Sequence, residues 1–177
     1  NGISTEAYAG DLMGNVWRFN LSGTTGTVIF TAKDSSSTPK AQPITAGMLI
    51  GKDPATSNVW LFFGTGRYLT QTDLSDKSVQ TWYGIIVEGT NAVTSTTTRS
   101  SLVQRTIAGE TAASGSTVAA RAITPPTPGD INGQSGWYMD LQYGTASGER
   151  MVTPNQFQGS LLLGTTRIPT SSDPCNP

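Results

Sequence analysis

The sequence of 177 residues has no histidine, a single cysteine and few charges, since Asp, Glu, Lys and Arg make up only 13% of it. Without histidine, the commonest general base and the commonest transition-metal ligand are both missing. The sequence also offers no recognisable pair of a nucleophile and a base. We therefore expect a protein that is not an enzyme.

The lone cysteine, Cys175, lies two residues before Pro177, so no disulfide can form within the chain. Two interpretations remain open. Cys175 is a free thiol, or its partner lies beyond Pro177. The second interpretation would make the end of this sequence a cut.

The small net charge of -1 excludes the basic surface that nucleic acids or anionic membranes require. No apolar run approaches the roughly 20 residues needed to cross a bilayer as a helix. Asn1 does not begin a signal peptide with a charged and then an apolar region. We expect no nucleic-acid partner and no membrane span, and the many small polar residues are typical of exported surface modules.

Short apolar runs alternate with clusters of Gly, Asn, Asp, Pro and Ser, and no helical period is sustained. This pattern predicts an all-β fold of antiparallel strands with almost no helix. The strands are expected at residues 7–10, 16–21, 27–31, 46–50, 59–64, 82–88, 102–108, 117–123, 137–141, 149–153 and 160–168.

The clearest local structure is a hairpin that begins at Tyr8 and Gly10 and turns around Gly14 and Asn15. Both turn residues tolerate a positive φ, as tight hairpin turns demand. Asp11 precedes this turn, and its carboxylate can accept backbone N–H groups there. We interpret Asp11 as a structural residue that holds the hairpin closed.

The strand after this turn alternates between an apolar and a mixed face. Trp17, Phe19 and Leu21 share one face, whereas Val16 and Arg18 lie on the other. We expect the face of Trp17 to point into the core, which makes Trp17 a residue that packs one blade against its neighbours.

The remaining strands repeat this pattern in a degenerate form, each ending in small residues. Gly64 and Gly66 frame one such turn, and the run 159–168 ends similarly. Evenly spaced short strands of this kind suggest the blades of a β-propeller. Residues 33–40 and 122–135 are rich in Ser, Pro and Gly and are expected to be surface loop insertions.

Three features carry alternative interpretations. Gly64-Thr65-Gly66 superficially resembles a phosphate-binding loop, but it lacks the following Lys and helix. Asp130, Asp140 and Glu149 would serve a glycosidase only if two of them faced one cleft. Aromatic residues could line a sugar groove, yet Trp17, Trp60 and Trp137 lie in apolar strand patterns that favour core packing.

Six segments together resemble the C-terminal domain of PilY/PilC-type type IV pilus proteins. They are residues 8–21 (Tyr-Ala-Gly-Asp-Leu-Met-Gly-Asn-Val-Trp-Arg-Phe-Asn-Leu), 62–69 (Phe-Phe-Gly-Thr-Gly-Arg-Tyr-Leu), 82–85 (Trp-Tyr-Gly-Ile), 136–141 (Gly-Trp-Tyr-Met-Asp-Leu), 148–153 (Gly-Glu-Arg-Met-Val-Thr) and 168–175 (Ile-Pro-Thr-Ser-Ser-Asp-Pro-Cys). They follow the family order and span nearly the whole chain.

The resemblance implies that residues 1–177 form part of one C-terminal domain, a modified β-propeller. It implies a bacterial, exported protein at the cell surface, the pilus tip or the outer membrane. Its expected roles are pilus biogenesis, the balance of extension and retraction, and surface adhesion. Its expected partners are pilins and minor pilins, the remainder of the same protein, and a host or surface receptor.

The family places an Asp/Asn-rich calcium loop just before the segment that corresponds to Tyr8. The family's closing acid falls on Thr5, with Glu6 beside it, and Asn1 is the other candidate ligand. Most of that loop would precede Asn1, so any calcium site here is a truncated one, and calcium is expected only in the intact protein. The family also continues past Cys175, so we expect this chain to be cut at both ends.

Two functions of other classes compete with a pilus factor. Residues 14–21 also resemble the tryptophan-containing strands of quinoprotein propeller oxidoreductases, which need a calcium and quinone site that is not visible here. A carbohydrate-binding β module would expose its aromatic residues on strands instead of burying them.

Overall fold

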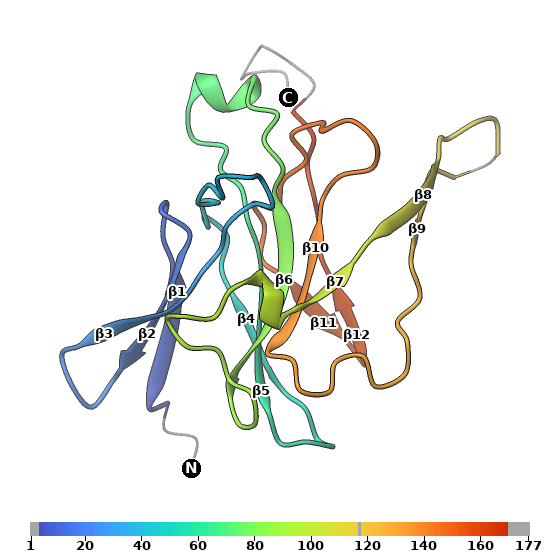
Figure 1. Cartoon of the computed structure of the whole chain (residues 1–177). Coiled ribbons are helices and arrows are strands. Elements are labelled where there is room, and N and C mark those ends of the chain that lie inside the picture. Colours follow the sequence, from blue (N-terminus) through green and yellow to red (C-terminus); the bar gives the residue numbers. More distant parts are fainter. Residues whose placement is uncertain (1–3, 117, 170–177) are drawn as a thin grey trace.

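Strands and the turns between them dominate the computed structural model, which describes residues 4–116 and 118–169 (Figure 1). The described strands are β1 (Glu6–Gly10), β2 (Asn15–Asn20), β3 (Gly26–Thr31), β4 (Leu49–Lys52), β5 (Val59–Gly64), β6 (Thr81–Glu88), β7 (Val103–Arg105), β8 (Ile107–Thr111), β9 (Ala120–Ile123), β10 (Gly136–Asp140), β11 (Gln156–Gln158) and β12 (Leu161–Leu163). Among the described residues, helix is limited to the single turns η1 (Gln71–Leu74) and η2 (Arg99–Ser101). The predicted all-β class is confirmed.

The strands form two larger sheets and two hairpins. Strands β1, β2 and β3 make an antiparallel sheet, and a second sheet has the order β4-β5-β6-β10-β7. All pairs in these sheets are antiparallel except β10 with β7. After β7 the chain leaves the sheet through β8 and β9 and re-enters as β10 in the same direction as β7, which departs from the purely antiparallel prediction.

The main core lies between the three-stranded sheet and one face of the five-stranded sheet. Strict alternation along β5 and β6 directs Leu61, Phe63, Tyr83 and Ile85 to this face, and each is at most 1% exposed. Phe30 of β3 packs edge-on against Tyr83, with ring centroids 5.5 Å apart. The period of two that predicted the strands thus also decides which residues hold the two sheets together.

The opposite face of the five-stranded sheet is rich in tryptophan. Trp137 lies over Gly84, where an added Cβ would come within 2.5 Å of the indole nitrogen. Trp137 also contacts Trp82 edge-on, with centroids 5.5 Å apart. Both rings pack against a smaller buried cluster that includes Met139 and Met151. Glycine at position 84 is therefore needed because the ring of Trp137 approaches the backbone there.

The predicted orientation of β2 is wrong. Val16 is fully buried in the main core, whereas Phe19 is 38% exposed and Leu21 is 54% exposed. Trp17 is half-buried on the same face as Phe19, and the two rings stack 6.3 Å apart. Apolar side chains on one face suggested that this face was the inner one, but β2 packs into the core through Val16 on the other face.

Two further strand predictions need correction. Residues 149–153 form no strand, and Arg150 makes only an isolated bridge with Arg167. The predicted strand 160–168 is shorter, because only Leu161–Leu163 pairs, with the unpredicted β11. Three-residue strands fall below the length at which a period of two can be recognised.

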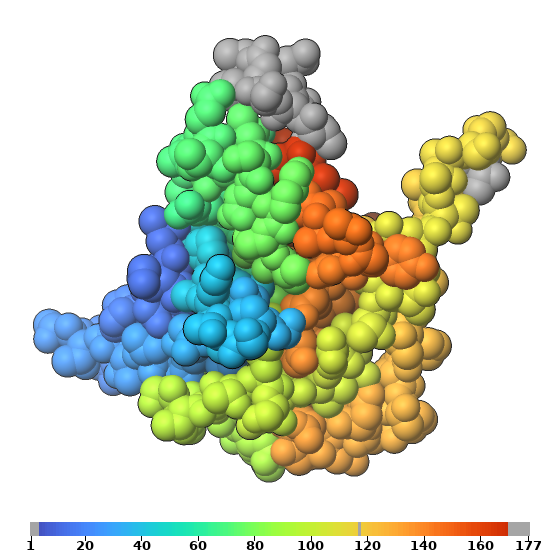
Figure 2. Space-filling model, turned by 45° about the horizontal axis from the view of Figure 1, so that its top comes forward, coloured from blue at the N-terminus to red at the C-terminus, as the bar shows by residue number. Residues whose placement is uncertain are grey.

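The hairpin of β8 and β9 projects from the body of the molecule, as both views show (Figures 1 and 2). The chain then returns to β10 through the exposed loop 124–135, so that Ala122 and Ile123 of the predicted insertion belong to β9. Residues 33–40 lie in the loop between β3 and β4, which an isolated bridge between Lys33 and Ala41 closes.

The orientation of β2 can be tested with two truncations on opposite faces. Val16→Ala should lower the free energy of unfolding by about 2 kcal/mol, because it removes buried methyl groups and leaves a cavity. Leu21→Ala should cost less than about 1 kcal/mol, since this side chain is largely exposed. Urea unfolding followed by tryptophan fluorescence measures both, and a larger loss for Leu21→Ala would contradict the observed orientation.

Candidate functional site

The Asp11 carboxylate organises the first hairpin turn. It accepts the backbone N–H groups of Met13 and Asn15 at 2.8 and 2.9 Å, the side-chain amide of Asn15 at 2.9 Å and the indole N–H of Trp17 at 2.8 Å. Burial alone would raise the pKa of Asp11, but these hydrogen bonds outweigh it and lower the pKa below its ordinary value. Asp11 is engaged within its own hairpin, where it also orients Trp17.

Gly14 and the residues of β1 lie in close contact with neighbouring parts of the fold. Gly14 has a φ of +76°, and an added Cβ would lie 2.6 Å from the carbonyl oxygen of Ala32. Asn15 already belongs to β2 and has no positive φ, contrary to prediction. Gly10 faces the side chain of Ile44, and Tyr8 packs at the edge of the main core.

The turn Gly64-Thr65-Gly66 is a packing element and not a phosphate cradle. The N–H of Thr65 donates to the carbonyl of Thr81, and that of Gly66 donates to the carbonyl of Pro43 at 2.7 Å. These N–H groups are therefore unable to bind an anion. Gly66 has a φ of +133°, and an added Cβ would lie 2.5 Å from the Cβ of Arg150.

Arg150 is the largest fully buried side chain, at 2% exposed. Its guanidinium donates to the backbone carbonyls of Gly148, Arg67, Asp73 and Asp76 at 2.6 to 2.9 Å. It joins the end of the Gly64–Gly66 turn, the loop around η1 and the segment that leads to Met151. The sequence segments 62–69 and 148–153 are thus two halves of one structural unit.

Asp73 completes this unit from the other side of the loop. Its carboxylate accepts the N–H groups of Leu69 and Thr70 at 3.0 and 2.9 Å, and it pairs with Arg67 at 2.6 Å. Burial would raise the pKa of Asp73, but these hydrogen bonds lower it to about 2. Asp73 was not predicted from the sequence, although Thr70 and Asp73 have the spacing of a capping box, a local signal for the start of a helical turn.

The acids that a glycosidase would need are each paired with an arginine. Asp130 binds Arg105, whose hydrogen bonds lower the pKa of Asp130 below its ordinary value. Asp140 accepts two hydrogen bonds from Arg99 at 2.8 and 3.0 Å. Glu149 forms its ion pair with Arg121. Each of these three carboxylates is therefore engaged by a different arginine.

Arg99 connects η2 to β6 and β10 of the five-stranded sheet. Besides Asp140, its guanidinium binds the hydroxyls of Thr81 and Tyr83 and lies over the ring of Tyr138, 4.4 Å from the centroid. Burial raises the pKa of Tyr83 to about 12, although the nearby Arg99 charge lowers it in part. The Tyr83 hydroxyl stays protonated and acts as a structural donor.

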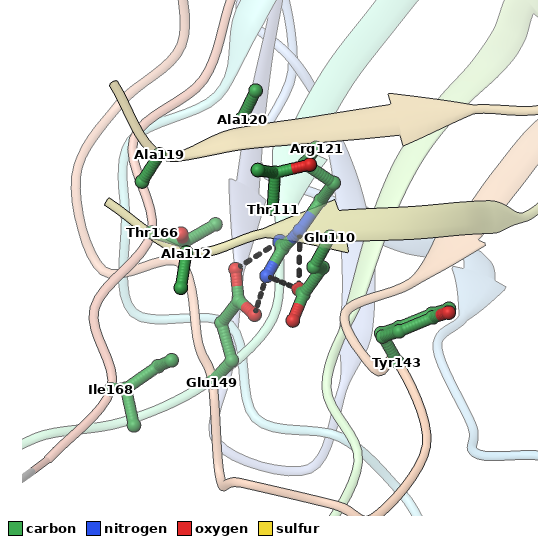
Figure 3. Close-up of a pocket in the computed structure, with 10 residues that line it drawn as sticks. All are labelled: Glu110, Thr111, Ala112, Ala119, Ala120, Arg121, Tyr143, Glu149, Thr166 and Ile168. Atoms are coloured by element: carbon green, nitrogen blue, oxygen red, sulfur yellow. Dashed lines mark hydrogen bonds and ion pairs between the residues drawn. The ribbon is translucent and has the colours of Figure 1, made fainter. Parts of the chain in front are cut away.

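A hollow of about 800 Å³ lies at the base of the projecting hairpin (Figure 3). In it, Arg121 of β9 donates to both oxygens of the nearly buried Glu149 at 2.7 and 2.9 Å and also pairs with Glu110 of β8. The hydrogen bonds that Arg121 donates to Glu149 raise the pKa of Arg121. One guanidinium thus pairs with two carboxylates and anchors the hairpin to the body, a contact that no local sequence pattern signals.

The described residues of the calcium candidate, Thr5 and Glu6, make other contacts. Glu6 accepts the hydroxyl of Tyr8 at 2.7 Å and lies 3.9 Å from Arg18, so its carboxylate is already engaged. Thr5 uses its carbonyl to accept the N–H of Leu21. Within residues 4–116 and 118–169, no group of three or more His, Cys, Asp and Glu could hold a metal. Asn1 and Cys175 lie outside the described residues.

Neither of the two described helical turns is long or apolar enough to cross a membrane. In the described residues, buried or half-buried arginines hold the loops in place through hydrogen bonds and ion pairs. Extended surfaces lie between these loops. These features define an all-β domain of small, mainly antiparallel sheets.

The comparisons with known proteins identify this domain more closely. The chain is 43% identical to a type IV pilus biogenesis factor PilY1 homolog of Xylella fastidiosa, over 179 residues and 99% of the chain. It is 32% identical to the type IV pilus biogenesis factor PilY1 of Pseudomonas aeruginosa over 218 residues, again 99% of the chain. It spans 14% and 18% of these two relatives. No protein-family model matches the chain.

The fold agrees with the sequence. The crystal structure of the Pseudomonas aeruginosa PilY1 C-terminal domain matches 96% of this chain with a TM-score of 0.77 and 27% identity, and the chain spans 43% of that domain. Sequence and fold together show that the chain is a homologue of part of the C-terminal domain of PilY1-type type IV pilus biogenesis factors.

The contribution of Arg150 to the free energy of unfolding can be measured by replacing it with an apolar residue of similar size. Arg150→Met should lower the free energy of unfolding by about 3 to 5 kcal/mol, because four carbonyl oxygens lose their donors. Arg167→Met is the matched control, since its exposed side chain makes no such contacts, and it should cost about 0.5 kcal/mol or less. Equal midpoints of chemical unfolding for the two variants would refute this role.

The low pKa of Asp73 predicts a loss of stability in acid. Since its folded pKa of about 2 lies below the ordinary 3.8, its carboxylate stabilises the fold fully above about pH 4, and this contribution disappears as the pH falls towards 2. Asp73→Asn should be less stable than the parent at pH 7, and the difference in melting temperature should shrink between pH 4 and pH 2. A difference that stays constant over this range would show that Asp73 is not the titrating group.

Proposed function

We propose that the chain is a non-catalytic component of the type IV pilus machinery that supports pilus biogenesis, the balance of extension and retraction, and surface adhesion. One observation carries this proposal: the match to PilY1-type biogenesis factors extends over 99% of the chain and is accompanied by the same fold. A role in pilus biogenesis is the function that these relatives share by name. Adhesion and the control of retraction are the finer parts of the proposal.

The absence of catalysis rests on how the polar residues are used. The strongest acid candidates, Asp11, Asp73, Asp140 and Glu149, each hold an arginine, a tryptophan or a turn. Charged groups that are engaged in internal hydrogen bonds stabilise the fold, whereas general acids and nucleophiles must face a substrate. A quinoprotein oxidoreductase would additionally need a cofactor site, and nothing in the described residues suggests one.

The same proposal extends to location and partners. We place the chain at the bacterial cell surface, on the pilus tip or the outer membrane, with pilins, minor pilins or the remainder of the same protein as neighbours. Calcium would act only in a more complete form of the domain, because Glu6 is engaged by Tyr8. A host or surface receptor is the partner that adhesion requires.

The proposal can be tested in the source bacterium by deleting the gene and complementing it. The deletion should reduce the number of surface pili and abolish twitching, and the unmodified gene should restore both. If the protein opposes retraction, removing the retraction motor from the deletion strain should bring back pili without bringing back twitching.

Complementation with the Arg150→Met and Arg167→Met variants provides a second test. Complementation with Arg167→Met should restore pili, whereas Arg150→Met should fail because the domain no longer folds stably. Normal piliation and twitching in the deletion strain would reject the proposed function.

A further inference from the structure

Two hollows on the outer face of the five-stranded sheet share Trp60 and Asp53 as lining residues. One, of about 760 Å³, is apolar and lies against β4, β5 and β11. The other, of about 330 Å³, is lined by more polar side chains and lies against the ends of β5 and β6 and the loop before β10. Together they are called the Trp60 groove. A groove with an aromatic half and a polar half fits a ligand that has both kinds of surface.

The apolar half consists of aromatic rings in a defined arrangement. Trp60 and Phe62 are nearly parallel, with centroids 6.1 Å apart and an interplanar angle of 6°. Phe157 meets Phe62 edge-on at 5.6 Å and is itself 47% exposed, and Ile50 on the edge strand is 50% exposed. Flat rings held in parallel offer a platform for the C–H faces of a pyranose ring, because such faces are apolar and slightly positive while the ring faces are negative.

The polar half supplies side-chain amides. Asn58 is only 8% exposed and uses its carbonyl oxygen to accept the N–H of Thr90 at 2.9 Å. Within the described part of the chain, the side-chain amides of Asn91, Asn132 and Gln134 make no hydrogen bonds, although all three line this hollow. Each amide offers both a donor and an acceptor. An apolar protein surface laid over them would bury these groups without partners, at a cost in free energy.

The charges around the groove favour a neutral ligand. Lys52 and Asp53 are the only charged residues among those that line the two hollows, and their charges are opposite. Hydrogen bonds from the Thr56 hydroxyl and the N–H of Ala55 lower the pKa of Asp53, so it is an acceptor at neutral pH. An anion would need an excess of positive groups, which these linings lack.

We propose that the Trp60 groove binds a neutral oligosaccharide. One sugar ring would lie on the Trp60 and Phe62 platform, and the hydroxyls of its neighbour would exchange hydrogen bonds with Asp53 and with the amides of Asn132 and Gln134. This inference rests on the adhesive part of the proposed function and names the chemistry of its receptor. It also gives Trp60 a role other than the core packing that its strand pattern predicted.

The proposal is tested by binding of the purified chain to neutral oligosaccharides of glucose, galactose, mannose and N-acetylglucosamine. Calorimetry and quenching of tryptophan fluorescence should reveal saturable binding of at least one of them, and adding a sialic acid or sulfate group should weaken it. Trp60→Ala should reduce the affinity at least tenfold. Asn132→Ala, at an exposed position that leaves folding intact, should reduce it several-fold, whereas the matched control Gln104→Ala on β7 should not.

Several results would contradict the proposed sugar site. Binding of none of these sugars, tighter binding of acidic than of neutral sugars, or an affinity unchanged in the folded Asn132→Ala and Trp60→Ala variants would overturn the proposal. Association of the chain through this face with a second copy or with an apolar protein, in place of sugar, would do the same. In cells, Asn132→Ala should lower adhesion but leave pili intact, so this proposal and the proposed function in pilus assembly can fail separately.

Discussion

A buried positive charge places the strongest constraint on this structure. The Arg150 guanidinium donates to four carbonyl oxygens of the loop around η1 and of its own segment, and at 2% exposed it has almost no contact with water. A buried charge is tolerated only if its hydrogen bonds are nearly all made. The surrounding backbone must therefore keep one arrangement, which positions the Gly64–Gly66 turn on one side and Met151 on the other.

The same principle recurs at other joints of the fold. Arg99 connects η2 to β6 and β10, Arg121 anchors the projecting hairpin to Glu149, and Arg105 holds Asp130 in the loop before β10. In a chain with so few charges, most arginines are thus used internally. Their planar, fixed donors suit this task better than lysine would. The consequence for function is that rigid loops frame the outer surfaces, while little charge is left over for chemistry.

These contacts give a physical explanation for the sequence similarity to PilY1. The segments that carried the family resemblance are those that meet in space: residues 62–69 with 148–153 through Arg150, and residues 82–85 with 136–141 through Trp137 lying over Gly84. Shared residues in this family therefore mark structural joints first. The groove around Trp60 adjoins these joints, because Phe62 and Trp137 also line it.

The sequence alone determined the fold class, most strand positions and the turn at Gly14, because a period of two and small turn residues are local properties of the chain. It also pointed to the PilY/PilC family. Only the tertiary structure decided which face of a strand points inward: β2 packs through Val16, and Trp17 and Phe19 lie outside. It likewise revealed the partners of Arg150 and Arg121 and the groove around Trp60. These contacts join residues far apart in the chain, and the buried environment that makes them matter exists only after folding.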